Sequence, residues 1–138
     1  MHQPTHWRTI EIPESFVTPD GYAGDIRMGS LRHPGTIDFL VYRSVDNAHD
    51  EGGMKPVYIG AFDIDGQPLW SVGEGGEQPS RPGPIAIHDI DGDGASEVIC
   101  FFKREDLDAA TSSLADIELQ IRDGATGQLK RSAAPEAL

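Results

Sequence analysis

The sequence predicts an all-β fold, made of two four-stranded antiparallel propeller-type blades with an extra N-terminal strand. Three observations favour this fold class. The 16 glycines and 10 prolines separate short runs rich in Ile, Val, Phe and Tyr, which is typical of strands joined by frequent turns. No segment reads as an amphipathic helix. The chain also contains an internal repeat, which indicates two units of the same architecture.

The apolar runs place the strands in order along the chain. One strand lies alone at the N-terminus, and the others form two groups. Each group reads as strand, tight loop, strand, long loop, strand, glycine-containing hairpin and strand. The predicted strands are Trp7 to Ile12; then Asp25 to Gly29, Ile37 to Arg43, Val57 to Phe62 and Pro68 to Val72; then Ile85 to His88, Glu97 to Lys103, Ile117 to Arg122 and Gln128 to Ser132.

The internal repeat has a period of about 60 residues, and it pairs Gly35 with Gly94 and Asp38 with Glu97. A four-stranded meander is the usual content of a propeller blade, and about four to eight blades close a propeller. We therefore expect residues 1–138 to form one partial β-propeller unit, with a leading strand in about 1–20, a first blade in 21–78 and a second in 79–138. Its sheet edges should be exposed and open to another copy or to a parent chain.

The strongest chemical motif runs from residue 89 to residue 97 and reads D-I-D-G-D-G-A-S-E. Alternating carboxylates can point successive oxygens inward around one hard cation, and Gly94 permits the sharp turn. Calcium takes about six to eight oxygen ligands, whereas magnesium prefers to keep several waters. The loop therefore predicts a Ca²⁺ site, with ligands from Asp89, Asp91, Asp93, the carbonyl of Ala95, and Glu97.

Other interpretations of acidic segments stay open. The loop could be a glycine-rich turn without an ion, although its carboxylates would then repel each other. An EF-hand or dockerin fits the first positions, but position 12 is Cys100 instead of a bidentate Glu, and a strand follows. D-I-D-G at Asp63 to Gly66 reads as a hairpin turn with positive φ at Asp65 and Gly66. In the first repeat Arg32 replaces a carboxylate, so it is either solvated or bonded to a neighbouring carboxylate.

Charge and composition exclude several function classes. Eleven Lys and Arg residues against 23 Asp and Glu residues give a net charge of −12, which disfavours nucleic acid and anionic membranes as partners. Cys100 is the one cysteine, so no intrachain disulfide forms. The N-terminus lacks the pattern of a signal peptide, and no apolar run has membrane length. These features predict a soluble chain that is cytoplasmic if its N-terminus is complete.

Several segments resemble a known family. PIAIHDIDGDGASEVICFF resembles the first two strands and calcium loop of an FG-GAP or VCBS-type propeller blade, and DIDGQPLW and RDGATGQL are similar to its outer hairpin. Together with GDIRMGSLRHPGTIDFLVYRS, the pattern from about Trp7 to Leu138 resembles the propeller of rhamnogalacturonan lyases of polysaccharide lyase family 11 and their uncharacterised relatives. The resemblance implies calcium-dependent β-elimination on the pectin backbone by a many-bladed ring, of which this chain would be a fragment.

A binding face is expected where the long loops between strands meet, opposite the calcium loop. Basic side chains there could pair with the carboxylates of an acidic polysaccharide, and a histidine could act as a base, although a solvated loop residue is the more common interpretation of each. The candidate ligand-binding residues are His49, Lys55, Arg81, Lys103 and Arg104. No catalytic residue can be assigned, because no nucleophile motif, nucleotide loop or zinc spacing is present.

Two functions follow from these features. The first is a calcium-binding propeller segment that binds carbohydrate or protein and does not catalyse a reaction by itself. The alternative is one part of a rhamnogalacturonan or other polysaccharide lyase that acts by calcium-dependent β-elimination. Activity on pectin fragments distinguishes the two.

Overall fold

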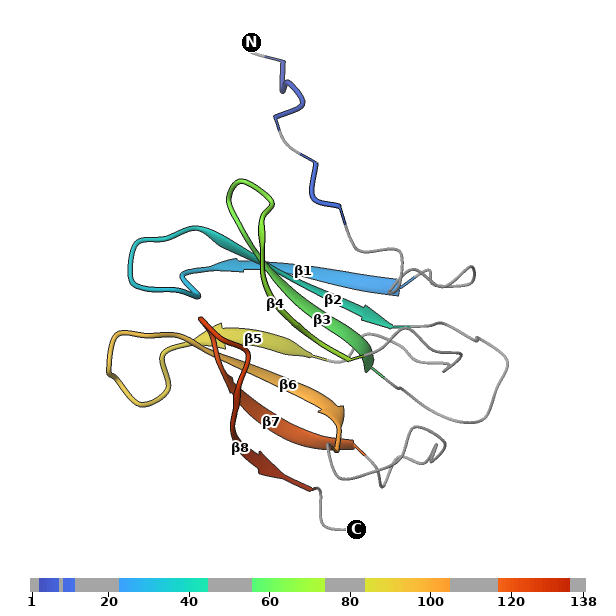
Figure 1. Cartoon of the computed structure of the whole chain (residues 1–138), viewed down its shortest axis with the longest axis vertical. Helices are drawn as coiled ribbons and strands as arrows, with labels where there is room; N and C mark the ends of the chain where they lie inside the picture. The colour runs from blue at the N-terminus through green and yellow to red at the C-terminus, as the bar shows by residue number, and fades with distance from the viewer. Residues whose placement is uncertain are drawn as a thin grey trace.

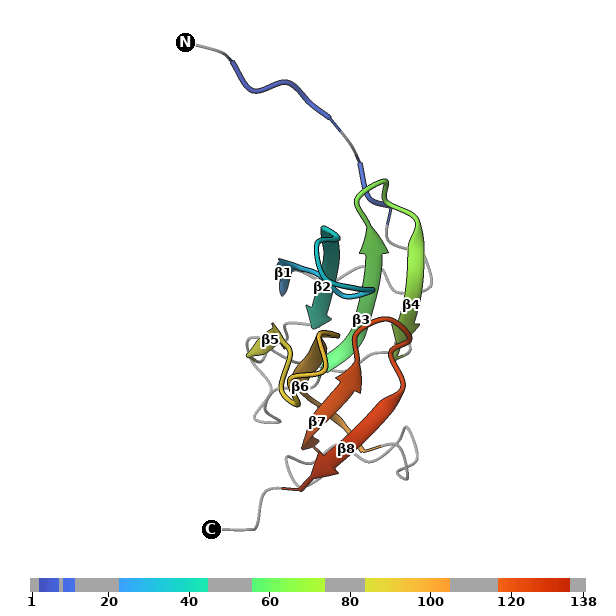
Figure 2. The same ribbon diagram turned by 90° about the vertical axis from the view of Figure 1, so that its left-hand side faces the viewer.

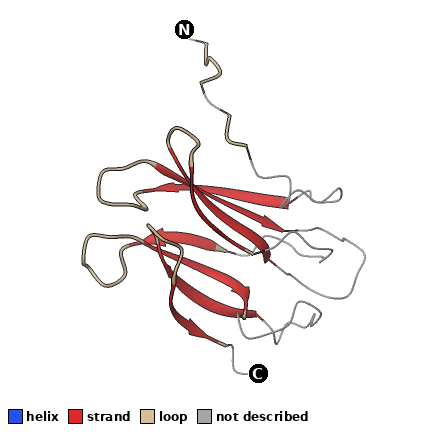
Figure 3. Ribbon diagram, viewed as in Figure 1, coloured by secondary structure: helices blue, strands red, loops and turns tan. Residues whose placement is uncertain are grey.

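The computed structural model describes residues 3–7, 9–11, 23–44, 56–73, 84–104 and 117–134. Every regular element in these ranges is a β-strand (Figure 3), so the all-β prediction is confirmed. The described part of the chain contains no helix that is long and apolar enough to cross a membrane.

The strands form two antiparallel sheets, and in each sheet the strands follow chain order (Figure 1). The sequence predicted these two four-stranded units, and the strand ends lie within about two residues of the predicted ones, as is usual for element boundaries. The first sheet contains β1 (Ala23–Gly29), β2 (Asp38–Ser44), β3 (Pro56–Asp63) and β4 (Pro68–Val72). The second contains β5 (Ile85–His88), β6 (Glu97–Lys103), β7 (Ile117–Asp123) and β8 (Leu129–Ala133).

The predicted N-terminal strand from Trp7 to Ile12 is wrong in its described part. Trp7 and residues 9–11 have no strand pairing, and the segment runs away from both sheets in Figure 1. Its backbone passes the turn between β3 and β4, where the carbonyl of Thr9 and the Cα of Ile10 approach Gly66. Because the segment crosses the tip of a hairpin and does not run beside an edge strand, its N–H and C=O groups cannot form a ladder.

The two sheets are layered, with β1 beside β5 (Figures 1 and 2). Gly29 of β1 allows this approach, because a Cβ at that position would lie 2.9 Å from Cγ2 of Ile87. The core lies between the layers, and burial of each large apolar side chain in it contributes about 1.5–3 kcal/mol. The buried members of this core are Leu31, Leu40, Tyr42, Ile59, Ala61, Ile85, Val98, Cys100 and Phe102.

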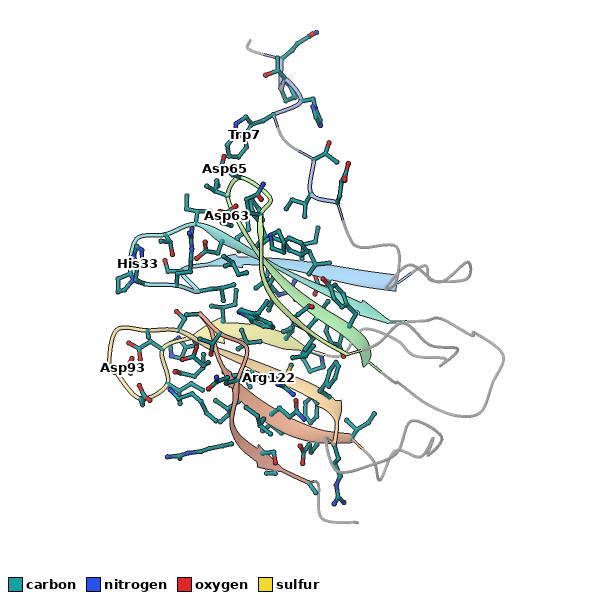
Figure 4. The ribbon with its side chains drawn as sticks, viewed as in Figure 1. Trp7, His33, Asp63, Asp65, Asp93 and Arg122 are labelled. Atoms are coloured by element: carbon teal, nitrogen blue, oxygen red, sulfur yellow. The ribbon has the colours of Figure 1, made fainter. Side chains whose placement is uncertain are left out.

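A buried polar ladder on β7 faces the same interior. Glu118, Gln120 and Arg122 occupy alternate positions, and register places Gln120 beside the core residue Cys100. Gln120 Nε2 donates to Glu118 Oε1 at 2.9 Å, and Arg122 Nε donates to Gln120 Oε1 at 2.9 Å. The guanidinium of Arg122, labelled over the strands of the second sheet in Figure 4, lies 5.8 Å from the ring centroid of Phe102. Paired in this way, the polar side chains can be buried without a large desolvation penalty.

The turn between β3 and β4 is a hairpin, as predicted, but of another type. Asp63 Oδ1 accepts the N–H groups of Asp65 and Gln67, both at 2.9 Å, which occupies this carboxylate with backbone donors. Gly66 has φ of 81°, whereas Asp65 does not have a positive φ, so that part of the prediction is wrong. The physical reason is loop length. Three residues separate Asp63 from Gln67, and in such loops a type I turn precedes a single left-handed residue.

Candidate metal centre

The candidate metal loop joins β5 to β6, beside the corresponding loop of the first sheet (Figure 4 labels Asp93 in one loop and His33 in the other). Asp89 follows the last residue of β5, and Glu97 is the first residue of β6. One carboxylate oxygen from each of Asp89, Asp91 and Glu97 lies within 4.8 Å of the others. Glu97 is 2% exposed and the side chain of Asp91 is 52% exposed, so this acidic group extends from the sheet to solvent.

Backbone N–H groups hold the loop around Asp89. The N–H of Gly92 donates to Asp89 Oδ1 at 2.7 Å, and the N–H of Gly94 donates to Oδ2 at 2.9 Å. These glycines have φ of 78° and 90°, values that residues with a Cβ rarely adopt. The N–H of Ile90 donates to Glu97 Oε2 at 2.9 Å and ties the start of the loop to its end. The two glycines therefore explain how the carboxylates come together.

A lysine from a distant strand contacts the acidic group. Lys130 lies on β8, two strands from β6 in the same sheet. Its Nζ lies 2.7 Å from Glu97 Oε1 and 3.2 Å from Asp91 Oδ2, so it donates charged hydrogen bonds to both. Sequence reasoning missed this residue, because its position depends on a register shift between Ile121 and Arg122 that no sequence pattern indicates.

The charges of the acidic group and the lysine stabilise each other. The hydrogen bond from Lys130 lowers the pKa of the Asp91 carboxyl below its usual value. In turn the hydrogen bonds to Glu97 and then to Asp91 raise the pKa of the Lys130 ammonium. Among the described residues, only one ammonium contacts the three carboxylates of Asp89, Asp91 and Glu97, so the group keeps a formal surplus of negative charge. That surplus favours a divalent cation.

The corresponding loop of the first sheet holds a guanidinium. Asp38, the repeat partner of Glu97, is fully buried, and its Oδ1 accepts Nε of Arg32 at 2.9 Å and Nη2 at 2.7 Å. Asp38 Oδ2 accepts the N–H of Leu31 at 3.0 Å, as Glu97 accepts that of Ile90 at the same repeat position. Of the two interpretations of Arg32, the structure supports bonding to a neighbouring carboxylate.

Asp93, the fourth predicted carboxylate ligand, is not a member of this group of three carboxylates. Asp93 is exposed, and its Oδ1 accepts the N–H of Ala95 at 2.8 Å. Of the four carboxylates that the sequence predicted as ligands, the structure therefore brings together Asp89, Asp91 and Glu97, and the carbonyl of Ala95 stays a prediction.

The donor set of the loop fits a hard divalent cation. Its grouped side-chain donors are all carboxylate oxygens, the ligands that calcium, magnesium and manganese prefer, and it includes no soft thiolate. The contact between Lys130 and two of these carboxylates shows that positive charge is favoured at this position. The residues that could hold a metal are thus those of the acidic group, with further oxygens of the same loop.

The predicted polysaccharide-binding residues fall mostly outside the described part of the chain. His49, Lys55 and Arg81 lie outside the described residues. Lys103 is the last residue of β6, and Arg104 follows it and is half-buried. Nothing in the described residues brings these candidates together, so the binding face stays a prediction.

Comparison with known proteins relates the chain to rhamnogalacturonan lyases. It is 34% identical over 99 residues, 62% of the chain, to the rhamnogalacturonan exolyase YesX of Bacillus subtilis (strain 168). It is 29% identical over 108 residues, 70% of the chain, to the rhamnogalacturonan endolyase YesW of the same organism. No family model matches the chain, and no solved structure matches it significantly. The matches cover 16% and 17% of these lyases, so the chain is similar to about a sixth of the length of the curated relatives it matches.

Proposed function

We propose that this chain is a calcium-binding β-propeller segment of FG-GAP or VCBS type, which presents a carbohydrate- or protein-binding surface and has no catalytic activity by itself. The observation that carries the proposal is the acidic group of Asp89, Asp91 and Glu97, gathered in a loop between two strands. Its surplus negative charge, its oxygen donors and the glycines that shape the loop all support a calcium ion.

The ion would have a structural role. Asp89 adjoins β5 and Glu97 begins β6, so an ion bound by both would connect the ends of two strands. Asp93 and the carbonyl of Ala95, further along the same loop, are the additional ligands we propose. Because the unfolded chain does not present these ligands together, the free energy of metal binding would add to the free energy of folding.

Thermal unfolding with and without calcium tests the metal site. At free calcium of about 100 times the Kd, binding stabilises a folded protein by about 2.7 kcal/mol. For a domain of this size the unfolding midpoint should then rise by about 10 °C. Asp91→Ala should abolish this rise, whereas Asp25→Ala, which removes a carboxylate from β1 next to Arg27, should preserve it. A wild-type chain whose midpoint does not respond to millimolar calcium would contradict the proposal.

Binding to rhamnogalacturonan oligosaccharides tests the ligand class. We propose that His49, Lys55, Arg81, Lys103 and Arg104 contribute to such a surface. Calorimetric titration should show binding of an acidic oligosaccharide and weaker binding of a neutral one, because the basic residues pair with uronate carboxylates. Equal affinity for both sugars, or binding that survives when Arg81 and Arg104 are replaced by Ala, would count against these residues.

The alternative is that this chain forms one part of a rhamnogalacturonan lyase that acts by calcium-dependent β-elimination. The similarity to an exolyase and an endolyase favours this alternative. β-Elimination creates an unsaturated product that absorbs ultraviolet light, so the absorbance of a rhamnogalacturonan solution reports the reaction directly. An absorbance gain with the purified chain and calcium would support the lyase, and a constant absorbance would count against lyase activity of this chain by itself.

A further inference from the structure

In both sheets a basic side chain contacts the buried carboxylate at the end of the loop between the first two strands. In the first sheet Arg32 contacts Asp38, and in the second Lys130 contacts Glu97. Asp38 and Glu97 occupy the same repeat position and accept the same backbone N–H, but the two cations come from different elements, the loop itself and β8. In each sheet the buried carboxylate at this repeat position therefore forms an ion pair with a basic side chain, as expected for a buried anion.

The two basic residues differ in how firmly they are held. Asp38 is enclosed, since its oxygens accept Arg32, the hydroxyl of Thr36 at 2.7 Å and two backbone N–H groups. The two cationic side chains are equally exposed, 36% for Arg32 and 35% for Lys130, so the difference lies in how they are held: Lys130 reaches its partners from an edge strand through a single ammonium group. A lysine ammonium on a flexible four-carbon stem can move into solvent, unlike a guanidinium held by several bonds.

We propose that Lys130 competes with calcium for Glu97 and Asp91, and that this competition sets the calcium affinity of the loop. The inference rests on the proposed calcium-binding function. An ion bound to these oxygens would lie about 2.3–2.6 Å from them. The ammonium already lies 2.7 Å from Glu97 and 3.2 Å from Asp91, so both cations cannot occupy this position together. Calcium must displace Lys130, and the lost hydrogen bonds weaken its binding.

Calcium titration of matched variants tests the competition. Lys130→Met should bind calcium about threefold to tenfold more tightly than the wild-type chain, because the ion no longer displaces a hydrogen-bonded ammonium. Arg131→Met is the control. It removes the same charge from the next position of β8, and Arg131 acts on Asp91 through charge alone, so its effect should stay below about twofold. Lys130→Gln serves as a second variant if Lys130→Met does not fold.

A second readout follows the lysine itself in the wild-type chain. Calcium should increase the rate at which an amine-reactive reagent modifies Lys130 several-fold, measured by mass spectrometry of the digested protein. If Lys130 kept its contacts with Glu97 and Asp91, its modification rate would be the same with and without calcium. Tighter binding by Lys130→Met together with this increase supports the proposal, as does calcium binding that appears only in the variant.

Two results would overturn it, and they differ. If the wild-type chain binds calcium, but neither Lys130→Met nor Lys130→Gln changes the affinity and the labelling rate is constant, the competition is wrong and the calcium site stands. If neither the wild-type chain nor the variants bind calcium at millimolar concentration, the proposed function fails together with the competition.

Discussion

At the scale of single residues, Asp38 shows how a buried carboxylate keeps its charge without a metal. Burial by itself raises the pKa of Asp38, but hydrogen bonds from the side chains of Thr36 and Arg32 and from the backbone of Arg32 and Leu31 oppose it. Their combined effect lowers the pKa below the ordinary value. Asp38 is therefore ionised at neutral pH, and its charge contributes to stability.

Acid should weaken the fold through this residue. The pKa of Asp38 is lower in the folded chain than its unfolded value of 3.8, so the unfolded chain binds the proton first as the pH falls. The stabilisation is complete above the unfolded pKa and is lost as the pH falls through the folded one. Urea unfolding at several pH values between about 6 and 2 should show a smaller acid-induced loss in Asp38→Asn than in the wild-type chain. Parallel profiles of the two proteins would contradict this expectation.

Removal of the Arg32 guanidinium should destabilise the fold, because the buried carboxylate of Asp38 is ionised. Arg32→Met leaves the fully buried carboxylate of Asp38 without its charged partner. We expect the free energy of unfolding to fall by about 1–3 kcal/mol. Arg27→Met is the control, because it removes an exposed ion pair with Asp25 and should cost less than about 1 kcal/mol. Equal losses in the two variants would show that Arg32 is an ordinary surface residue.

At the scale of elements, the hairpin between β7 and β8 is pressed against the first sheet. Gly127 has φ of 73°, and a Cβ there would lie 2.6 Å from the indole ring of Trp70. Gly127→Ala should therefore lower the free energy of unfolding by about 2–4 kcal/mol, from backbone strain and overpacking together. Gly35→Ala provides a matched control, since Gly35 has φ of 87° but nothing within 4 Å of the added Cβ.

The free energy of unfolding of the control Gly35→Ala should fall by about 1–2 kcal/mol, which is the cost of placing an alanine in a left-handed backbone conformation. Chemical unfolding of both variants measures the difference directly. If Gly35→Ala is destabilised as much as Gly127→Ala, the contact with Trp70 does not contribute.

Much of the fold could be predicted from the sequence, because glycine and proline mark the strand ends and the repeat shows that the units are alike. The alternation of polar and apolar residues on β7 illustrates what the sequence pattern could not predict. It separates Glu118, Gln120 and Arg122 from Leu119 and Ile121, but the polar set is the one that faces the core. A period of two shows which residues share a face and leaves open which face is buried.

The candidate metal centre also has a part that the sequence predicts and a part that it does not. The carboxylates of one short loop are close in sequence, so their spacing predicts that Asp89, Asp91 and Glu97 come together. Lys130 joins them across β7, through strand pairing and a register shift. Contacts of that kind depend on tertiary structure and are absent from local sequence patterns.

At the scale of the whole molecule, the internal repeat relates the inner face of the first sheet to the outer face of the second sheet, and these two faces have different surroundings. The inner face of the first sheet packs against the second sheet and carries Leu40, Tyr42, Ile59 and Ala61. The equivalent positions of the second sheet lie on its outer face and carry Ile99, Phe101, Leu119 and Ile121. Phe101 is 37% exposed, whereas its partner Tyr42 is 1% exposed and donates its hydroxyl to the carbonyl of Phe101 at 3.3 Å. The outer face of the second sheet therefore has the composition of a face that packs on another sheet.

We expect the isolated chain to self-associate through this outer face, since a second copy offers the sheet surface that it lacks. Sedimentation velocity should show a mass that rises with concentration. Phe101→Lys should shift the chain toward the monomer, because it places a charge in the centre of the apolar face. Trp7→Lys, a substitution of an exposed aromatic residue in the N-terminal segment, should leave the association unchanged. A wild-type chain that is monomeric at all concentrations would contradict the expectation.

Trp70 also provides an optical signal of how the two layers meet. Its Nε1 donates to the carbonyl of Gly124 at 2.8 Å, which links β4 to the β7–β8 turn of the other sheet. The chain has two tryptophans, and Trp7 is 65% exposed. Separation of the layers would wet the half-buried indole of Trp70 and move its fluorescence emission to longer wavelength, while the emission of Trp7 would change little. With Trp7 replaced by Phe, the emission of one side chain would report the contact between the sheets in real time.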